Sequence, residues 1–326
     1  MGNPTYSIVD AMIPGEPDKF ASMVTPDRHG VEDRKLRVVN AAELLTLKIP
    51  PREHILEPIL QTQSTSMLFA KRGFGKTYLS LGTGCAVAAG APFLRWKAPK
   101  PRKVLYCDGE MPAISMQERF ASIVAGMDTA MEPDFFRLIT PDLQSNPMPS
   151  LSGIIGQSII EDQLGDTELL ILDNISTLTT GGKENEAESW LPVQQWVLSL
   201  RRRGISVLLI HHAGRNGEQR GTSRREDVLD TMITLRRADD YTESEGARFE
   251  IHFTKARSIH GKDAEPFEVR MHTESGAAIW TMSDLDDVTE SRVRSLLDDG
   301  LSIREAAKEL GIHRSRVERI KNRRSQ

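Results

Sequence analysis

The chain has 326 residues, of which 39% are hydrophobic and 27% charged, and its formal net charge is −4 at pH 7. This length and balance fit one large α/β domain with a small appended domain, and they exclude an intrinsically disordered chain. The longest apolar runs, such as residues 169–172 and 207–210, are too short to cross a bilayer, and the N-terminus lacks the pattern of a signal peptide. We therefore expect a cytoplasmic protein with no membrane partner.

The N-terminal segment has no regular pattern. Residues 1–35 mix Pro, Gly, Asp and Arg without helical or strand periodicity and carry no motif. We predict a flexible N-terminal arm over residues 1–39, either mobile or in contact with a partner. Periodicity begins near residue 40, where an amphipathic helix is expected at residues 41–47, followed by a Pro-rich turn.

From the turn onward, strand and helix patterns alternate. Residues 78–89 are rich in Ala and Leu and predict a buried helix, and residues 184–203 have helical spacing. The expected strands are residues 66–70, 103–107, 136–139, 169–172 and 205–210. This alternation predicts an α/β fold in which helices cover both faces of a mostly parallel central sheet.

The pattern changes beyond residue 212. A Gly- and Arg-rich stretch at residues 213–226 is expected to form a loop. It is followed by strand candidates that we expect to extend the edge of the sheet, at residues 232–236, 248–254, 267–271 and 278–282. Residues 284–326 become helical and polar. We therefore predict a core domain over residues 40–283 and a small all-α domain over residues 284–326.

A candidate phosphate-binding loop lies between the first expected strand and helix. It reads Ala70-Lys71-Arg72-Gly73-Phe74-Gly75-Lys76-Thr77, a match to the P-loop of nucleotide triphosphatases with Ala in place of the commoner first Gly. Glycines let backbone N–H groups approach phosphates, and the helix start adds partial positive charge. Lys76 would reach the β- and γ-phosphates of ATP, and Thr77 would ligate Mg²⁺. The predicted nucleotide-binding residues are Arg72, Gly73, Phe74, Gly75, Lys76, Thr77 and Tyr78. The alternative, a Gly-rich turn without a nucleotide, is disfavoured by the flanking strand and helix.

Two acidic residues follow buried strands. Asp173 ends the apolar run at residues 169–172, which predicts a position beside the phosphates and a role as Mg²⁺ partner. An Asp that only caps the next turn is the alternative. Because Asn174 follows it, the base that activates water must come from elsewhere. Glu110, just past the strand at residues 103–107, is one candidate, and an exposed loop acid is the alternative reading.

Short motifs occur in a fixed order along the chain. They are Gly73-Phe74-Gly75-Lys76-Thr77, Tyr106-Cys107-Asp108-Gly109-Glu110, Leu172-Asp173-Asn174, Ile210-His211-His212 and Lys255-Ala256-Arg257. Over about residues 40–275 this set resembles the RecA-type motor core, and within that group it is most similar to plasmid RepA-type hexameric replicative DNA helicases. The resemblance implies a RecA-like fold, MgATP hydrolysis, a hexameric ring and Glu110 as the catalytic base.

The resemblance also implies roles for the histidines and for the last motif. His211 and His212 stand where the family carries a polar sensor that couples the γ-phosphate to the DNA-facing loop, and we favour His212 for that role. A metal-binding pair is the rival, but adjacent residues on a strand point to opposite faces. Lys255 and Arg257 match a Lys-x-Arg pair that acts in the neighbouring subunit's site, which implies a homo-oligomer. An exposed strand end is the alternative for this pair.

Two regions are candidates for DNA binding. The loop at residues 213–226 is basic and lacks aromatic residues, so it predicts salt-sensitive binding of single-stranded DNA; solvated loop charge is the alternative. Its candidate contacts are Arg215, Arg220, Arg224 and Arg225. Residues 301–320 resemble a helix-turn-helix, in which double-stranded DNA would be contacted by Arg314, Arg316 and Arg319. A basic helix pair for protein contacts is the alternative there.

These features favour an ATP-driven DNA motor, with an ATP-gated DNA-binding regulator or a replication initiator without unwinding activity as the second hypothesis. The helix-turn-helix supports the second hypothesis, because a minimal helicase of this kind needs no double-strand reader. A recombination mediator is weaker because no separate N-terminal polymerisation motif is present. A small-molecule kinase is weaker still, since nothing resembles a lid or an acceptor pocket.

Overall fold

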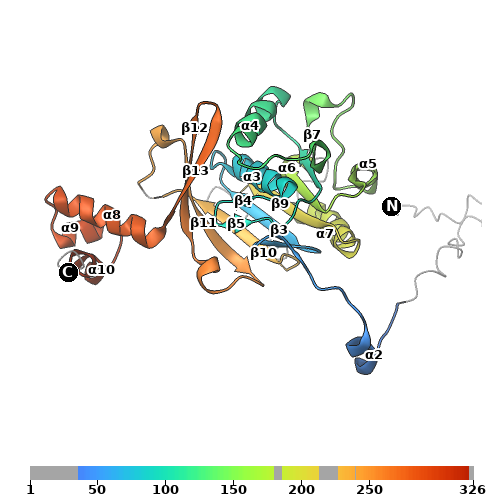
Figure 1. The fold of residues 1–326 in the computed structure, drawn as a ribbon, viewed down its shortest axis with the longest axis horizontal. Helices are drawn as coiled ribbons and strands as arrows, with labels where there is room; N and C mark the ends of the chain where they lie inside the picture. Colours follow the sequence, from blue (N-terminus) through green and yellow to red (C-terminus); the bar gives the residue numbers. More distant parts are fainter. Residues whose placement is uncertain (1–35, 180–185, 213–226, 239, 323–326) are drawn as a thin grey trace, which may run out of the picture. The chain divides into compact units, whose positions relative to one another are not determined.

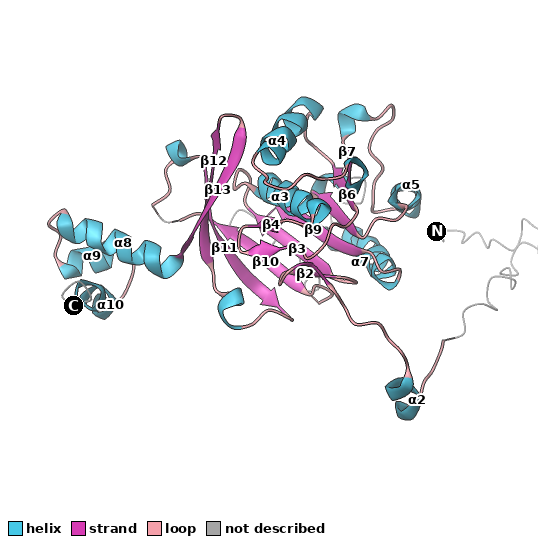
Figure 2. Cartoon of the chain, viewed as in Figure 1, coloured by secondary structure: helices cyan, strands magenta, loops and turns pink. Residues whose placement is uncertain are grey.

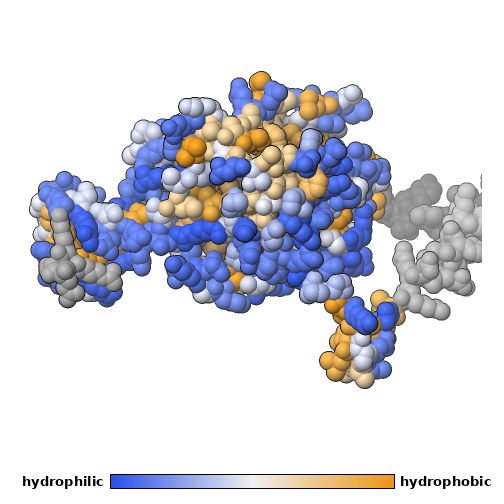
Figure 3. Space-filling model, in the orientation of Figure 1, coloured by the Kyte–Doolittle hydropathy of each residue, from blue (hydrophilic) through white to orange (hydrophobic). Residues whose placement is uncertain are grey.

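The computed structural model describes residues 36–179, 186–212, 227–238 and 240–322. The chain divides between Pro51 and Arg52, and the two parts are described separately. The first part holds α2 (Ala41–Thr46), whose N-cap Asn40 accepts a hydrogen bond from the Glu43 N–H. This helix confirms the one expected at residues 41–47, but it buries none of its residues. Figure 3 shows apolar surface on this segment, where the exposed large side chains are Leu36, Val38, Leu44, Leu45 and Ile49.

The second part is built on a nine-stranded sheet in the order β13-β12-β11-β10-β3-β9-β8-β6-β7 (Figures 1 and 2). The parallel strands are β3 (Thr65–Ala70), β6 (Val104–Asp108), β7 (Phe136–Ile139), β8 (Leu169–Asp173), β9 (Ser206–His212) and β10 (Thr231–Arg236). Their parallel pairing confirms the predicted α/β fold. Because parallel strands run the same way, their carboxyl ends meet at one edge of the sheet.

Helices cover both faces of the sheet, because the strand side chains alternate between two apolar clusters. Leu68 and Ala70 of β3 pack with α3 (Lys76–Ala89) and α4 (Ala113–Ala125). Met67 and Phe69 of the same strand point the other way. That opposite face is covered by α5 (Ile154–Leu164), α6 (Ile175–Leu178) and α7 (Glu186–Arg202). Burial on both faces explains the continuous apolar runs of these strands.

The sheet continues on one side with antiparallel strands. β11 (Ala247–Ala256), β12 (Phe267–Glu274) and β13 (Ala277–Asp284) follow β10 in spatial order, which confirms the expected extension of the edge. Two short hairpins that the sequence did not predict pack beside α3. They are formed by β1 (His54–Leu56) with β2 (Leu60–Gln61), and by β4 (Pro92–Phe93) with β5 (Trp96–Lys97).

Three C-terminal helices follow β13 within the described residues: α8 (Leu285–Asp298), α9 (Ile303–Glu309) and α10 (Arg314–Asn322). Ser302 and Glu305 form a capping box that fixes the start of α9. Gly311 has φ +60° in the turn between α9 and α10, a conformation that disfavours other residues. The helices enclose a small core of their own, around Val293, Ala306, Val317 and Ile320. Among the described residues, no helix is both long and apolar enough to span a membrane.

Candidate nucleotide site

The candidate phosphate loop leaves the carboxyl end of β3 and leads directly into α3. Gly73 and Gly75 have φ values of +78° and +86°, in the left-handed region that favours glycine. A Cβ on Gly75 would also lie 2.9 Å from the Phe249 ring. Gly75 is the N-cap of α3 and supplies no side-chain cap, so the first N–H groups of the helix have no partner there. The loop therefore has the geometry of an anion-binding helix start.

Lys76 is buried at the first turn of α3 and points back into the loop. Its Nζ donates hydrogen bonds to the carbonyl oxygens of Ala70 (3.0 Å) and Lys71 (2.8 Å). Burial lowers the pKa of Lys76 to about 8, and the positive charge of Arg72 acts in the same direction, whereas Asp173 and Glu110 oppose the shift. The ammonium group is therefore charged at neutral pH and lies where phosphate oxygens would be bound.

This pKa predicts a pH dependence of nucleotide binding. Lys76 loses its charge as the pH rises through about 8, well below its ordinary value of 10.5. If the charged form is the one that binds ATP, affinity measured by titration should fall about tenfold between pH 7 and pH 9. A Lys76→Arg variant is the control, because a guanidinium stays charged over this range. Equal pH profiles in both proteins would contradict the prediction.

The predicted Mg²⁺ partners lie next to each other. Asp173 ends β8, and the Thr77 side chain hydrogen-bonds to it. Tyr106 donates to Asp173 Oδ2 over 2.6 Å and contacts the Ser80 hydroxyl at 2.8 Å, which fixes the carboxylate. Burial raises the pKa of Asp173, and the Tyr106 and Thr77 hydrogen bonds oppose that shift.

This pair fits magnesium held together with a nucleotide. Within the described residues, no group of three or more His, Cys, Asp or Glu side chains could hold a metal by itself. Mg²⁺ in nucleotide sites uses one or two protein oxygens and completes its shell with phosphates and water. A buried carboxylate beside a Thr hydroxyl at the helix start suits that arrangement.

Glu110, His212 and Asn174 converge near Lys76. Glu110 Oε1 lies 3.7 Å from His212 Nε2, and the Asn174 amide nitrogen lies 3.0 Å from the same ring atom. Because Asn174 Oδ1 accepts a hydrogen bond from the Thr177 N–H, the Asn174 amide nitrogen faces His212 as donor. Burial and the charge of Lys76 lower the pKa of His212, so its ring is neutral at pH 7. The structure therefore brings together three side chains from the ends of neighbouring strands.

Asp108 holds the backbone of Glu110, a role the sequence did not reveal. Its carboxylate accepts hydrogen bonds from the Glu110 N–H (3.4 Å), the Met111 N–H (3.0 Å) and the Thr140 hydroxyl (3.0 Å). Burial raises the pKa of Asp108 to about 6, although these hydrogen bonds oppose the shift. The only available signal was an Asp at the end of a strand, two residues before the candidate base.

The Lys-x-Arg pair lies away from this site in the same chain. Lys255 is paired with Met232 near the start of β10, and the Arg257 N–H donates to the Asp230 carbonyl. Asp230 in turn adjoins Thr65 at the start of β3. Thr65 and Ala70 stand at opposite ends of β3. At about 3.3 Å per residue, Thr65 therefore lies about 17 Å from Ala70. The pair therefore cannot act on its own chain's phosphate loop, and its predicted role in a neighbouring subunit stays a prediction.

The structure describes the candidate DNA-binding residues only in part. Arg215, Arg220, Arg224 and Arg225 lie outside the described residues. On α10, Arg314 pairs with Glu318 at 2.8 Å and Arg316 with Asp286 at 2.5 Å, while Arg319 is exposed. DNA contact by this helix stays a prediction.

Comparison with known families gives one match and one negative result. Residues 31–218 match the model of AAA_25, described as an AAA domain. This match spans more than half of the chain and contains the phosphate loop, Glu110, Asp173 and His212. The chain belongs to the AAA_25 family. No curated protein matches the sequence.

Membership makes this AAA domain a P-loop ATPase, and such ATPases use ATP, typically with Mg²⁺. The match ends at residue 218, before β10. The antiparallel strands and the C-terminal helices of this AAA domain protein therefore lie beyond the family model. The geometry around Lys76 and Asp173 agrees with the family's chemistry, because both side chains are buried at the carboxyl edge of the sheet.

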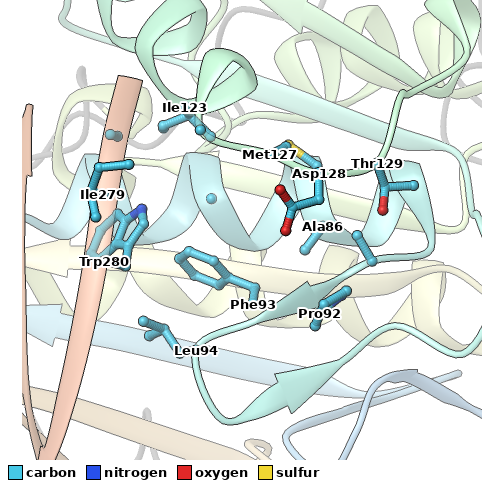
Figure 4. Close-up of a pocket in the computed structure, with 14 residues that line it drawn as sticks. Ala86, Pro92, Phe93, Leu94, Ile123, Met127, Asp128, Thr129, Ile279 and Trp280 are labelled. Carbon is cyan, nitrogen blue, oxygen red and sulfur yellow. The ribbon is translucent and has the colours of Figure 1, made fainter. Parts of the chain in front are cut away.

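A separate cavity of about 360 Å³ lies elsewhere in this AAA domain protein (Figure 4). Figure 4 shows Phe93, Leu94 and Trp280 on one side and Met127 and Asp128 on another. The Phe93 and Trp280 rings meet edge to face, with centroids 5.3 Å apart. Its lining includes the middle of α3 but no residue of the phosphate loop, so it is distinct from the nucleotide site.

Proposed function

We propose that this protein is an ATP-driven DNA motor, a RepA-like replicative helicase that acts on single-stranded DNA. It would hydrolyse MgATP at the subunit interfaces of a hexameric ring. The observation that carries the proposal is the convergence of Glu110, His212 and Asn174 beside Lys76. A candidate base thus contacts a candidate sensor that directly precedes the basic segment at residues 213–226.

Each side chain has a defined task in the proposed reaction. Lys76 binds phosphate oxygens and offsets their negative charge, and the N–H groups at the start of α3 orient them. Thr77 and Asp173 would hold Mg²⁺, which would supply positive charge to neutralise the phosphates. Glu110 accepts a proton from the attacking water at a carboxylate oxygen. Asp108 keeps the backbone at Glu110 in place by accepting hydrogen bonds from the Glu110 N–H and the Met111 N–H.

His212 is suited to report on the state of this site. Its Nε2 accepts from Asn174 and lies close to Glu110, so a shift of either neighbour changes the position of the ring. The ring is partly buried at the last residue of β9. Its displacement would pass, in the proposed motor, to the chain that follows. In the proposed motor, that chain carries Arg215, Arg220, Arg224 and Arg225 to the phosphates of single-stranded DNA.

The second candidate is an ATP-gated DNA-binding regulator or a replication initiator that does not unwind DNA. The C-terminal helices favour it, since α9 and α10 are joined by a short turn and enclose an apolar core together with α8. In this alternative, Arg314, Arg316 and Arg319 bind double-stranded DNA and ATP hydrolysis resets assembly.

One set of assays separates the two candidates. ATP hydrolysis is measured with no DNA, with single-stranded DNA and with duplex DNA, and strand separation is followed on a forked duplex. The motor predicts stimulation by single strands and ATP-dependent separation of the fork, with the Lys76→Ala variant inactive in both. Stimulation by duplex alone, without strand separation by the assembled oligomer, would instead support the regulator.

A further inference from the structure

Arg237 contacts the phosphate loop from the next strand of the sheet. It follows the carboxyl end of β10, which runs parallel to β3, so both strand ends lie at the same edge. Its Nη2 donates to the Gly73 carbonyl over 3.2 Å. The guanidinium carbon lies 4.8 Å from the centroid of the Phe74 ring and 3.5 Å from that of the Tyr241 ring. Arg237 is thus placed against two aromatic rings, one of which belongs to the loop.

Tyr241, the second ring that Arg237 contacts, is held by hydrogen bonds of its own. The Tyr241 hydroxyl donates to the Gly246 carbonyl, and the Tyr241 N–H donates to the Ala238 carbonyl, each over 3.0 Å. Asp240 pairs with Arg248 at 3.0 Å and accepts from Arg292 of α8 over 2.6 Å. Tyr241 is therefore held in place by these interactions. Arg237 links Tyr241 to the phosphate loop.

The contact with Gly73 bears on phosphate binding through peptide geometry. In a trans peptide the carbonyl and the following N–H point in opposite directions. Holding the Gly73 carbonyl on Arg237 therefore also fixes the direction of the Phe74 N–H. Backbone N–H groups of this loop are the donors that bind phosphates in P-loop proteins. Gly73 has little stiffness of its own, because glycine has the widest conformational freedom.

We propose that Arg237 is a positioning residue of the nucleotide site, which fixes the phosphate loop in its binding conformation by clamping Gly73 and Phe74 against Tyr241. The inference rests on the proposed ATP hydrolysis at this loop. Arg237 acts through the loop, so its removal weakens nucleotide binding more than it slows the chemical step. The planar guanidinium suits this role, since it stacks and donates hydrogen bonds at the same time.

The test compares Arg237→Ala with Arg236→Ala, which removes the same charge from an exposed neighbour. Dissociation constants for a fluorescent ATP analogue are measured together with KM and kcat for ATP. For Arg237→Ala, Kd and KM should rise about tenfold while kcat changes less than about threefold, given the lost stacking and charged hydrogen bond. Arg236→Ala should change each value less than about twofold. Arg237→Lys should recover only part of the affinity.

The outcomes distinguish this inference from the proposed function. If Lys76→Ala still hydrolyses ATP at the wild-type rate, the assignment of hydrolysis to this loop fails. If Lys76→Ala is inactive and Arg237→Ala binds the analogue like the wild type, the positioning role is overturned. A merely structural role predicts a lower melting temperature with an unchanged Kd. Should Arg237→Ala not fold, Arg237→Lys carries the test, and an unchanged Kd in that variant overturns the proposal.

Discussion

The Glu110→Gln variant is expected to hydrolyse ATP about 100- to 1,000-fold more slowly than the wild type, while its affinity for ATP changes little. Glutamine keeps the size of the side chain and the backbone contacts of Glu110 with Asp108, but it cannot accept a proton from water. Steady-state phosphate release and equilibrium binding of an ATP analogue measure the two effects separately. A large loss of kcat without a loss of binding would identify Glu110 as the base.

The control for this variant is Glu118→Gln, on the exposed surface of α4. It removes one carboxylate from the same part of the chain without touching the site, so its kcat should stay within about twofold of the wild type. If Glu110→Gln also kept its kcat within about fivefold, Glu110 would act as an exposed loop acid and the base would have to be another group.

The Arg257→Ala variant is expected to lose about 1,000-fold in ATP turnover as an assembled oligomer, the effect of removing an arginine that acts in trans. Within its own chain, the Arg257 guanidinium donates to the Asp227 carbonyl at the end of the sheet opposite the phosphate loop. The phosphate loop of the same chain is therefore out of reach, and in the proposed ring a neighbouring subunit would present its nucleotide to Arg257. Lys262→Ala, five residues along the chain and exposed, should retain normal turnover.

Mixing variants tests the shared site directly. Arg257→Ala keeps an intact phosphate loop, and Lys76→Ala keeps an intact Arg257. In a head-to-tail ring assembled at random from equal amounts, about a quarter of the interfaces would combine both intact halves. ATP turnover should therefore return to about a quarter of the wild-type value. No recovery in a mixture shown to co-assemble would contradict a shared site.

The chain order of motifs made most of the nucleotide site predictable. A P-loop is local, since its glycines, its Lys and its Thr are consecutive, and the predicted helix and strand around it are present. The placement of Asp173 and Glu110 at the same edge of the sheet was predictable because parallel strands bring their carboxyl ends together, and their roles stay predictions. The expected alternation of His211 and His212 was also confirmed, since His211 is buried and His212 partly exposed.

The supporting contacts were not predictable in the same way. Arg237 and Gly73 are 164 residues apart, and nothing in the sequence near Arg237 marks it as a neighbour of the loop. Tyr106 lies in a run of buried strand residues, so its hydrogen bond to Asp173 depends on which face it occupies. Asp108 and Asn174 stand at strand ends, where many Asp and Asn residues only cap a turn or a helix. Their contacts with Glu110 and His212 become visible only in the folded structure.

By itself, the sequence determined that this protein folds as an α/β P-loop ATPase with a chain-ordered set of candidate site residues. Periodicity and short motifs carry that information because they depend on neighbours a few residues apart. Only the tertiary structure decided how the loops are held. Asp108 accepts a hydrogen bond from the Glu110 N–H, and Asn174 contacts the His212 ring. Arg237 donates a hydrogen bond to Gly73 of the phosphate loop. The Asn174 and Arg237 contacts join residues at the ends of different strands, and the register of the sheet determines which of these residues meet. The Asp108 contact is local and depends on how the chain turns after β6.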